Sequence, residues 1–298
     1  MGEITLRKAL DDYKTVYMPY RNFAERTRVE YQNDLENVVR FFEQSGINHV
    51  RELGLPIIER YVARLEQEGL ASSTRKRKVA SIRSFLSFLF QDGYIAVDIA
   101  KRIIPPFLEN AIPHILTQDE CDRIRKACAD SPRDLAIIEL LLQTGIKLSE
   151  LIRLTSNDIE FVHTNGIREE YKGIMRIQGS RGKKERLIPL NSKACLALKN
   201  YLDIRKGVGS NILFRNRFGE VLGERGVQKM LRRYLKKIGL ERASVQTLRH
   251  TFGIHHAVNG TSAKTIQEVM GHKDPRSTSI YFSMAQEIMK RELQDHAI

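Results

Sequence analysis

Prolines are concentrated just beyond the first third of the chain. The segment 103–114 holds three of them, Pro105, Pro106 and Pro113. Proline fixes its own φ angle and lacks a backbone N–H group, so this segment cannot be regular helix or strand throughout. The 298-residue chain also exceeds the usual size of one compact domain. We therefore expect two domains, at residues 1–102 and 115–298, joined by a linker at 103–114.

Apolar residues ahead of the linker recur at the three-to-four spacing of amphipathic helices. The stripes are Tyr31, Leu35, Val38, Val39 and Phe42, then Ile58, Tyr61, Val62 and Leu65, then Val79, Ile82, Phe85, Leu86 and Leu89. Thr27 and Glu30 have the spacing of a capping box, which predicts that the first of these helices begins near Thr27. The first domain is therefore expected to be helical.

A basic run opens the third stripe, and the whole chain is strongly basic. The run is Arg75, Lys76, Arg77 and Lys78, and the formal net charge is +13. A solvated charged face is the ordinary explanation of such a run, but in a chain this basic it favours contacts to the phosphates of a nucleic acid. A membrane surface is the competing polyanion. No apolar run reaches the roughly 18 residues that span a bilayer, and no signal-peptide pattern opens the chain, so we expect a cytoplasmic protein.

The second domain combines helices with a small β-hairpin. Thr117 and Glu120 form a second capping-box pair, and the apolar stretch 135–142 predicts a buried helix. The turn-rich segment 179–182 is flanked by Ile174, Arg176 and Gln178 on one side and by Leu187, Ile188 and Leu190 on the other, which predicts two paired strands, and helices resume at Ser192. The three cysteines fit neither disulfide nor metal-ligand spacing and are expected to be reduced core thiols: Cys121, Cys128 and Cys195.

Four stretches of the second domain carry reactive or charged side chains in a fixed order. They are Thr144 to Leu151, the hairpin Gly179 to Leu190, Gln246-Thr247-Leu248-Arg249-His250, and Gly271-His272 with Tyr281. Together they resemble the catalytic domain of the tyrosine recombinase and integrase family, and the first third looks like that family's core-binding, SAM-like DNA-binding domain. The nine positions from His272 to Tyr281 match the family's interval. The resemblance covers nearly the whole chain and implies a mainly α, two-domain, C-shaped DNA clamp.

The resemblance implies a role for each matching residue. Tyr281 is expected to be the nucleophile that forms a 3′-phosphotyrosyl link, while Arg249 and His272 contact the scissile phosphate. A guanidinium suits this task because it can donate two parallel hydrogen bonds to a phosphate. His250 is expected to play a supporting, packed role, and Glu150 to orient its neighbours. This transesterification requires no cofactor and no metal, since the nucleophile and the charges come from side chains.

Three positions depart from the family pattern, and two of them lie outside the hairpin. The first arginine of the family falls at Lys147, which keeps the positive charge but loses the bidentate fork. A histidine of the family falls at Gln246, whose amide can donate a hydrogen bond but cannot hold a transferable proton near neutral pH. We expect slower chemistry from the first change, and we expect acid–base work lost at Gln246 to move to His272.

The hairpin leaves the general acid for the leaving 5′ oxygen open. Depending on the end from which the family's lysine is aligned, it falls at Ser180 or at Arg181, and arginine is a poor acid because it stays protonated. Lys183 is our preferred acid and Lys184 the alternative. Arg181, Lys184 and Arg186 are otherwise expected to contact DNA phosphates.

The resemblance implies an Xer-like or cointegrate-resolving recombinase. It would act as a dimer on each double-stranded DNA site and a tetramer in the synapse, through a Holliday junction. The helical segment 284–297 would dock on a neighbouring protomer or pack on its own domain. Two alternatives stay open: a DNA-binding homologue that has lost catalysis, and a type IB topoisomerase.

Overall fold

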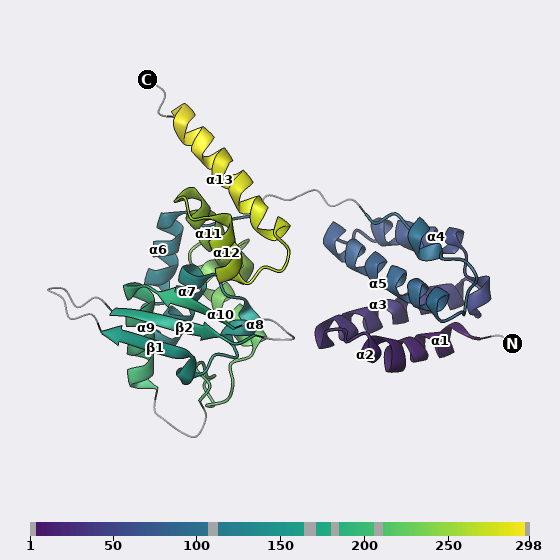
Figure 1. Cartoon of the computed structure of the whole chain (residues 1–298), viewed down its shortest axis with the longest axis horizontal. Coiled ribbons are helices and arrows are strands. Elements are labelled where there is room, and N and C mark those ends of the chain that lie inside the picture. The colour runs from purple at the N-terminus through teal and green to yellow at the C-terminus, as the bar shows by residue number, and fades with distance from the viewer. Residues whose placement is uncertain (1–3, 107–112, 164–170, 180–184, 206–210, 296–298) are drawn as a thin grey trace. The chain divides into compact units, whose positions relative to one another are not determined.

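The computed structural model describes residues 4–106, 113–163, 171–179, 185–205 and 211–295. The chain divides into two compact units, Met1–Ala111 and Ile112–Ile298. Each unit has its own buried apolar core, and Figure 1 draws both. Residues 107–112 of the expected linker lie outside the described part of the chain.

The N-terminal unit is built from helices, as its apolar stripes predict. Its elements are α1 (Leu6–Asp12), the π-helical turn η1 (Tyr13–Tyr17), α2 (Met18–Tyr20), α3 (Glu25–Gln44), the short turn η2 (Val50–Glu52), α4 (Leu55–Gln67), α5 (Ser72–Gln91) and the short turn η3 (Ile99–Arg102). Leu35 on α3, Ile58 on α4 and Phe85 on α5 are all buried in one core. The expected start near Thr27 is wrong, because Arg28 N–H already donates to the Ala24 carbonyl and α3 begins at Glu25.

The basic run lies at the start of α5, and much of its charge is neutralised within the unit. Asp34 on α3 is buried and accepts hydrogen bonds from the guanidinium of Arg77 and, at 3.0 Å, from Lys78 Nζ. Arg75 pairs with Glu66 at 2.6 Å. Lys76 is the exposed member of the run. Three of the four cations therefore hold helices together, whatever they contact outside the protein.

The C-terminal unit begins with helices and returns to them after a small sheet. Its elements are α6 (Gln118–Ala127), α7 (Pro132–Thr144), α8 (Leu148–Leu151), the short turn η4 (Ser156–Asp158), β1 (Ile159–His163), β2 (Tyr171–Ile177), β3 (Arg186–Leu190), α9 (Ser192–Ile204), α10 (Glu224–Lys237), α11 (Val245–Val258), α12 (Ala263–Met270) and α13 (Arg276–Asp295). The capping box of Thr117 and Glu120 at the start of α6 is confirmed. The three cysteines are buried free thiols, as expected.

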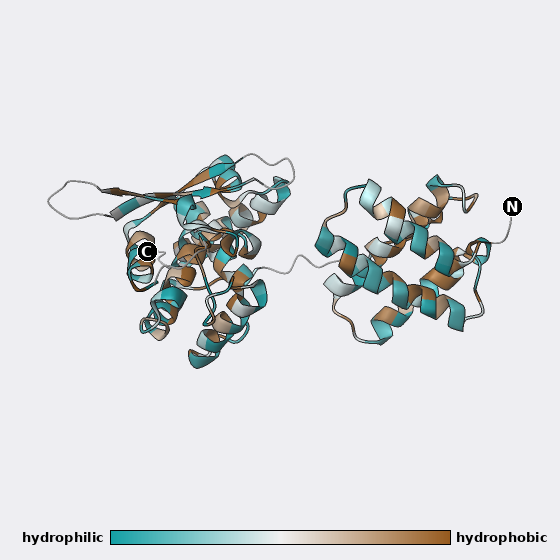
Figure 2. Cartoon of the chain, turned by 90° about the horizontal axis from the view of Figure 1, so that it is seen from below, coloured by the Kyte–Doolittle hydropathy of each residue, from teal (hydrophilic) through white to brown (hydrophobic). Residues whose placement is uncertain are grey.

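The predicted hairpin forms two strands of an antiparallel sheet. Strand β2 pairs with β3, and Met175 lies opposite Ile188 with both side chains buried. A third strand, β1, pairs with the other edge of β2 and was not expected from the sequence. The sheet forms a layer on one side of the unit, with helices against one of its faces (Figure 2). The sheet thereby places the start of β3 beside the loops that carry the candidate site.

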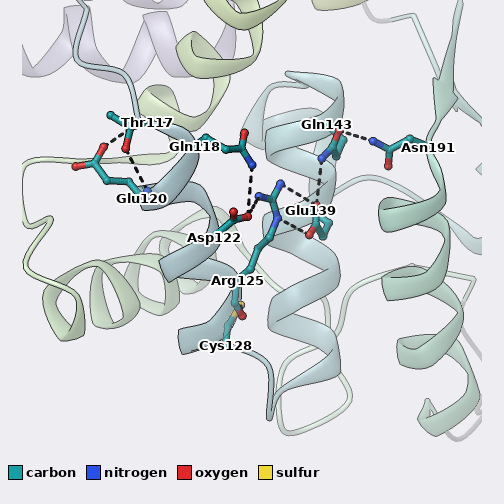
Figure 3. A network of polar contacts seen from close by, with 9 residues as sticks. All are labelled: Thr117, Gln118, Glu120, Asp122, Arg125, Cys128, Glu139, Gln143 and Asn191. Atoms are coloured by element: carbon teal, nitrogen blue, oxygen red, sulfur yellow. Dashed lines mark hydrogen bonds and ion pairs between the residues drawn. The ribbon is translucent and has the colours of Figure 1, made fainter.

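Polar contacts fix α6 and α9 to α7, the helix that leads into the candidate site. Arg125 on α6 pairs at 2.7 Å with the buried Glu139 of α7 (Figure 3). At the next turn of α7, Gln143 donates to Glu139 and accepts from Asn191, the residue that caps α9. These contacts hold the C-terminal end of α7 in place, and the chain passes from there directly to Lys147.

The C-terminal segment is a direct continuation of the helix that carries Tyr281. Helix α13 runs without a break from Arg276 to Asp295, and its last turns extend beyond the other helices of the unit in Figure 1. Within the described part of the chain, no helix is both long and apolar enough to cross a membrane.

Replacing Asp34 with alanine should destabilise the N-terminal unit, because Arg77 and Lys78 would lose a buried acceptor. We expect the free energy of unfolding to fall by about 1–3 kcal/mol, measured by urea unfolding followed by circular dichroism. The matched control is Glu68→Ala, which breaks an exposed pair with Arg64 on one helix and should cost about 0.5 kcal/mol or less. Equal losses for the two variants would contradict this account.

Candidate active site

The turn between α7 and α8 presents Lys147. Helix α7 ends at Gly145, which adopts a left-handed φ of 57°. A Cβ atom there would lie 2.4 Å from the ring of Phe252, so both the backbone angle and the packing require glycine. Lys147 then caps α8: its backbone N–H donates to Glu150 Oε2 at 2.9 Å, and its Nζ donates to the Gly271 carbonyl at 3.2 Å.

Glu150 and Arg186 form a two-pronged ion pair next to this turn. The Arg186 guanidinium donates to both carboxylate oxygens, at 3.0 and 2.8 Å, and each side chain is 16% exposed. Burial by itself would raise the pKa of Glu150, but the hydrogen bonds from Arg186 and from the Lys147 N–H outweigh it and lower that pKa. Glu150 is therefore a fixed negative charge at neutral pH.

Arg249 lies in the middle of α11 and is only 4% exposed. Its guanidinium donates to the carbonyl of Gly145 and, at 2.7 Å, to the carbonyl of Met270. Burial lowers its pKa, yet an arginine remains protonated in proteins. The structure thus holds a permanent positive charge with backbone dipoles instead of a carboxylate partner.

His272 follows the C-terminal cap of α12. Its Nδ1 lies 2.8 Å from Oγ1 of the buried Thr278, at the start of α13. Burial and the nearby positive charges of Arg249 and Lys147 lower the pKa of His272 to about 4. The imidazole is therefore neutral near pH 7 in the free protein.

Tyr281 points into this group from α13 and is 1% exposed. Its hydroxyl lies 3.1 Å from His250 Nδ1, and His250 Nε2 lies 3.2 Å from the amide nitrogen of Gln246. A Cβ at Gly253 would lie 2.6 Å from the Tyr281 ring, so this glycine in the middle of α11 is what lets the ring approach. Burial raises the pKa of Tyr281, and the charge of Arg249 only partly offsets it.

The predicted site residues of the C-terminal unit come together here as far as they are described. The cluster contains Lys147, Glu150, Gln246, Arg249, His250, His272 and Tyr281. Arg186 joins it, although we expected it among the DNA contacts. Arg181, Lys183 and Lys184 lie outside the described residues. Their roles stay predictions, as do the DNA contacts of the basic run in the other unit.

Two residues of the cluster escaped the sequence reasoning. Thr278 orients His272, and nothing in a single sequence marks one threonine among many for such a contact. Gly253 carries a usable signal, because a glycine inside a helix generally costs stability and points to close packing.

The cluster combines a potential nucleophile with excess positive charge. The cations of Lys147, Arg186 and Arg249 outnumber the single carboxylate of Glu150, which leaves about two net positive charges at low dielectric. An oxyanion such as a phosphodiester fits this balance, because its charge rises from one to two in the transition state of nucleophilic attack. Among the described residues, no group of three His, Cys, Asp or Glu side chains could hold a metal ion.

The sequence patterns of known families match both units of the chain. The pattern described as "Phage integrase family" matches residues 114–287, and "Phage integrase, N-terminal SAM-like domain" matches residues 10–93. One relative, "Tyrosine recombinase XerC" of Pelotomaculum thermopropionicum, is 31% identical over 308 residues, covering 95% of each chain. "Tyrosine recombinase XerD" of Oceanobacillus iheyensis is 29% identical over 302 residues, covering 98% of each.

Solved structures share the fold. The XerH site-specific recombinase bound to a palindromic difH substrate, in a post-cleavage complex, superposes with a TM-score of 0.76 at 20% identity. The match covers 95% of this chain and 83% of that one. At this identity the likeness concerns the fold alone.

The low pKa of His272 should make stability depend on pH. Because the folded-state pKa of about 4 lies below the unfolded value of about 6.5, the unfolded state binds more protons between these values. The free energy of unfolding should therefore fall as pH drops from 7 to 4.5. In His272→Gln this fall should be smaller, measured by urea unfolding at both pH values. The same substitution at the exposed His255 is the matched control, and an identical fall in wild type and His272→Gln would refute the assignment.

Proposed function

The chain belongs to the phage integrase family of tyrosine recombinases, and we propose that it cuts and rejoins DNA strands at specific sites through Tyr281. The observation that carries this proposal is the position of the Tyr281 hydroxyl, 3.1 Å from His250 and inside a cluster with net positive charge. The substrate is double-stranded DNA, whose phosphates suit both this cluster and the net charge of +13.

The chemistry follows from the contacts. The Tyr281 oxygen passes its proton to the neutral imidazole of His272 and attacks phosphorus. The bond from phosphorus to tyrosine forms as the bond to the 5′ oxygen breaks, which leaves a 3′-phosphotyrosyl link and a 5′ hydroxyl. Lys147 and Arg249 stabilise the charge that develops on the non-bridging oxygens. Because the link conserves the phosphodiester bond energy, a 5′ hydroxyl can reseal the strand without ATP. Lys183 remains our preferred proton donor to the 5′ oxygen.

His250 is the immediate partner of the nucleophile. The Gln246 amide nitrogen can donate to His250 Nε2, which leaves the His250 proton on Nδ1, directed at the Tyr281 oxygen. Burial and the charge of Arg249 lower the pKa of His250, so the ring is neutral at physiological pH. A neutral donor of this kind stabilises the phenolate, and Gln246 thereby acts on the nucleophile instead of on the phosphate.

DNA binding must precede this chemistry. Tyr281 is 1% exposed and its pKa is raised by burial, so a phosphate can reach the hydroxyl only after the covering groups move. The free protein is therefore expected to be inert, with the nucleophile protonated.

A homo-oligomer is the expected working form. A groove of about 1050 Å³ between α6, β3 and α11 has an apolar lining that includes Leu142 and Ile254. Ile288 of α13 lines it in the same chain, whereas Met289 and Leu293 further along α13 are exposed. Docking of the end of α13 from one copy in the groove of a second copy would bury Met289 and Leu293. Solved structures of the same fold, a lambda integrase dimer bound to a COC' core site and a lambda integrase tetramer bound to a Holliday junction, support dimers on each site and a tetramer in the synapse.

The remaining assignments follow from this function. The two units would close on DNA as a clamp, and Lys76, with the other cations of the basic run, would contact phosphates from the N-terminal core-binding domain. A cytoplasmic location gives access to such DNA. No observation favours the catalytically inactive homologue or the type IB topoisomerase.

Wild-type protein should form a covalent complex on nicked suicide duplexes. The target sequence of these duplexes can be selected from a random-sequence pool by binding to the protein. Tyr281→Phe should form none while its DNA affinity stays within about threefold, because only the attacking oxygen is removed. A denaturing gel detects the complex. A covalent complex with the phenylalanine variant would assign the nucleophile elsewhere, and its absence in wild type would favour the inactive homologue. Relaxation of supercoiled DNA that carries no selected site would favour the topoisomerase.

Lys147→Arg should raise the rate of strand cleavage. A guanidinium can donate two parallel hydrogen bonds to a phosphate, whereas the ammonium offers a point charge. In other enzymes, the loss of one hydrogen bond to the developing oxyanion slows the reaction on the order of 10²-fold. The measurement is single-turnover cleavage of the suicide duplex, with the equally conservative Lys199→Arg on α9 as the control. An unchanged or lower rate in Lys147→Arg would argue against a contact of this residue with the phosphate.

A further inference from the structure

We propose that Arg186 is a positioning residue, which joins the segment of Lys147 to the segment of His272 and does not itself bind DNA. The inference rests on the proposed function, since it concerns the geometry of the same site. It replaces the expectation that Arg186 is one of several cations that contact DNA phosphates.

The contacts of Arg186 are distributed over two parts of the chain. Its two terminal nitrogens bind both oxygens of Glu150, and its Nε donates to the Val269 carbonyl on α12 at 2.8 Å. Arg186 is the first residue of β3. One guanidinium thus connects the sheet, the start of α8 and the end of α12, and these contacts use three of its five N–H donors.

Gly271 lets the guanidinium approach the backbone. A Cβ atom at Gly271 would lie 2.9 Å from Arg186 Cζ, so any larger residue would displace the arginine. Gly271 also has a left-handed φ of 63° as the C-terminal cap of α12. The glycine before His272 is therefore required twice, once by its backbone angle and once by the plane of the guanidinium above it.

The contacts close a ring around the site. Glu150 receives Arg186 and also the N–H of Lys147, and Lys147 Nζ in turn donates to the Gly271 carbonyl. Lys147 and Gly271 are far apart in the sequence, so no local structure fixes their distance. Removing Arg186 opens this ring on the side of α12. The positions of Lys147 and His272 relative to one another are then no longer fixed. A displacement of either side chain by about 1 Å can slow the reaction on the order of 10²-fold.

The guanidinium also acts on His272 through its charge. The groups that face His272 are Arg249 and His250 from α11, Lys147 at the start of α8, Arg186 from β3, and Thr278 and Tyr281 from α13. Arg186 is one of the charges that lower the pKa of this histidine. Its loss should raise that pKa, which gives a spectroscopic signal independent of cleavage.

The test compares Arg186→Met, Arg186→Lys, Glu150→Gln and the Glu150→Gln/Arg186→Met double variant in the full chain. We expect Arg186→Met to reduce single-turnover cleavage about 10²-fold. Lysine should rescue little of this loss, because one ammonium cannot reproduce the fork and the third contact. The double variant should be no slower than the slower single variant, since both act through one ring. Multiplied losses in the double variant would overturn the proposal, as would full rescue by lysine.

DNA affinity separates positioning from phosphate contact. If Arg186 only positions its neighbours, Arg186→Met should bind the duplex within about threefold of wild type with the same salt dependence. A phosphate contact would instead lower the slope of log K against log salt by about one, and that result would overturn the proposal. The NMR titration of His272 should move to higher pH in Arg186→Met, and an unmoved titration would also count against it.

The control for folding is Arg176→Met on the neighbouring strand β2, which removes an exposed ion pair with Glu185. Thermal unfolding of every variant identifies loss of fold. If Arg186→Met is unfolded at the assay temperature, the comparison passes to Glu150→Gln and Arg186→Lys, where slower cleavage with unchanged DNA binding supports the ring and unchanged cleavage overturns it. Covalent-complex formation by wild type monitors the proposed function separately, so its failure is distinguishable from a failure of this inference.

Discussion

The arrangement of this site depends on burying positive charge without neutralising it. Arg249 is held by two backbone carbonyls, and Lys147 donates to a third, that of Gly271. Carbonyl dipoles satisfy the donors while leaving the net charge in place, whereas carboxylates would cancel it. The one carboxylate, Glu150, is assigned to Arg186. What remains is a preorganised positive field, and an oxyanion is the group that such a field stabilises.

Burial and this field together set the protonation state of the neighbouring groups. They keep His272 neutral, with a pKa of about 4, whereas burial keeps the phenol of Tyr281 protonated against the opposing charge of Arg249. The free protein therefore holds the proposed nucleophile in its protonated form. A phosphate that enters would compensate the cations and remove much of their effect on the histidines, so substrate binding and the protonation of the site are coupled through one electrostatic balance.

The structure gives contacts for the two described residues that depart from the family pattern, Gln246 and Lys147. Gln246 reaches His250 and not the centre of the cluster, which makes it part of the environment of Tyr281. Lys147 keeps a charge at the position of an arginine and adds a contact to Gly271. Lys147 thus keeps a positive charge in the cluster, while Gln246 acts through its hydrogen bond with His250.

Many of the helices and most of the described site residues could be predicted from the sequence, because they depend on local patterns. Helical stripes, the capping box of Thr117 and the order of motifs ending at Tyr281 need only neighbouring residues and their spacing. Strand β1, the pairing of Arg186 with Glu150 and the contact of Thr278 with His272 were decided by the tertiary structure. These contacts join segments that no periodicity relates, and whether a cation faces DNA or a buried carboxylate depends on what the fold brings beside it.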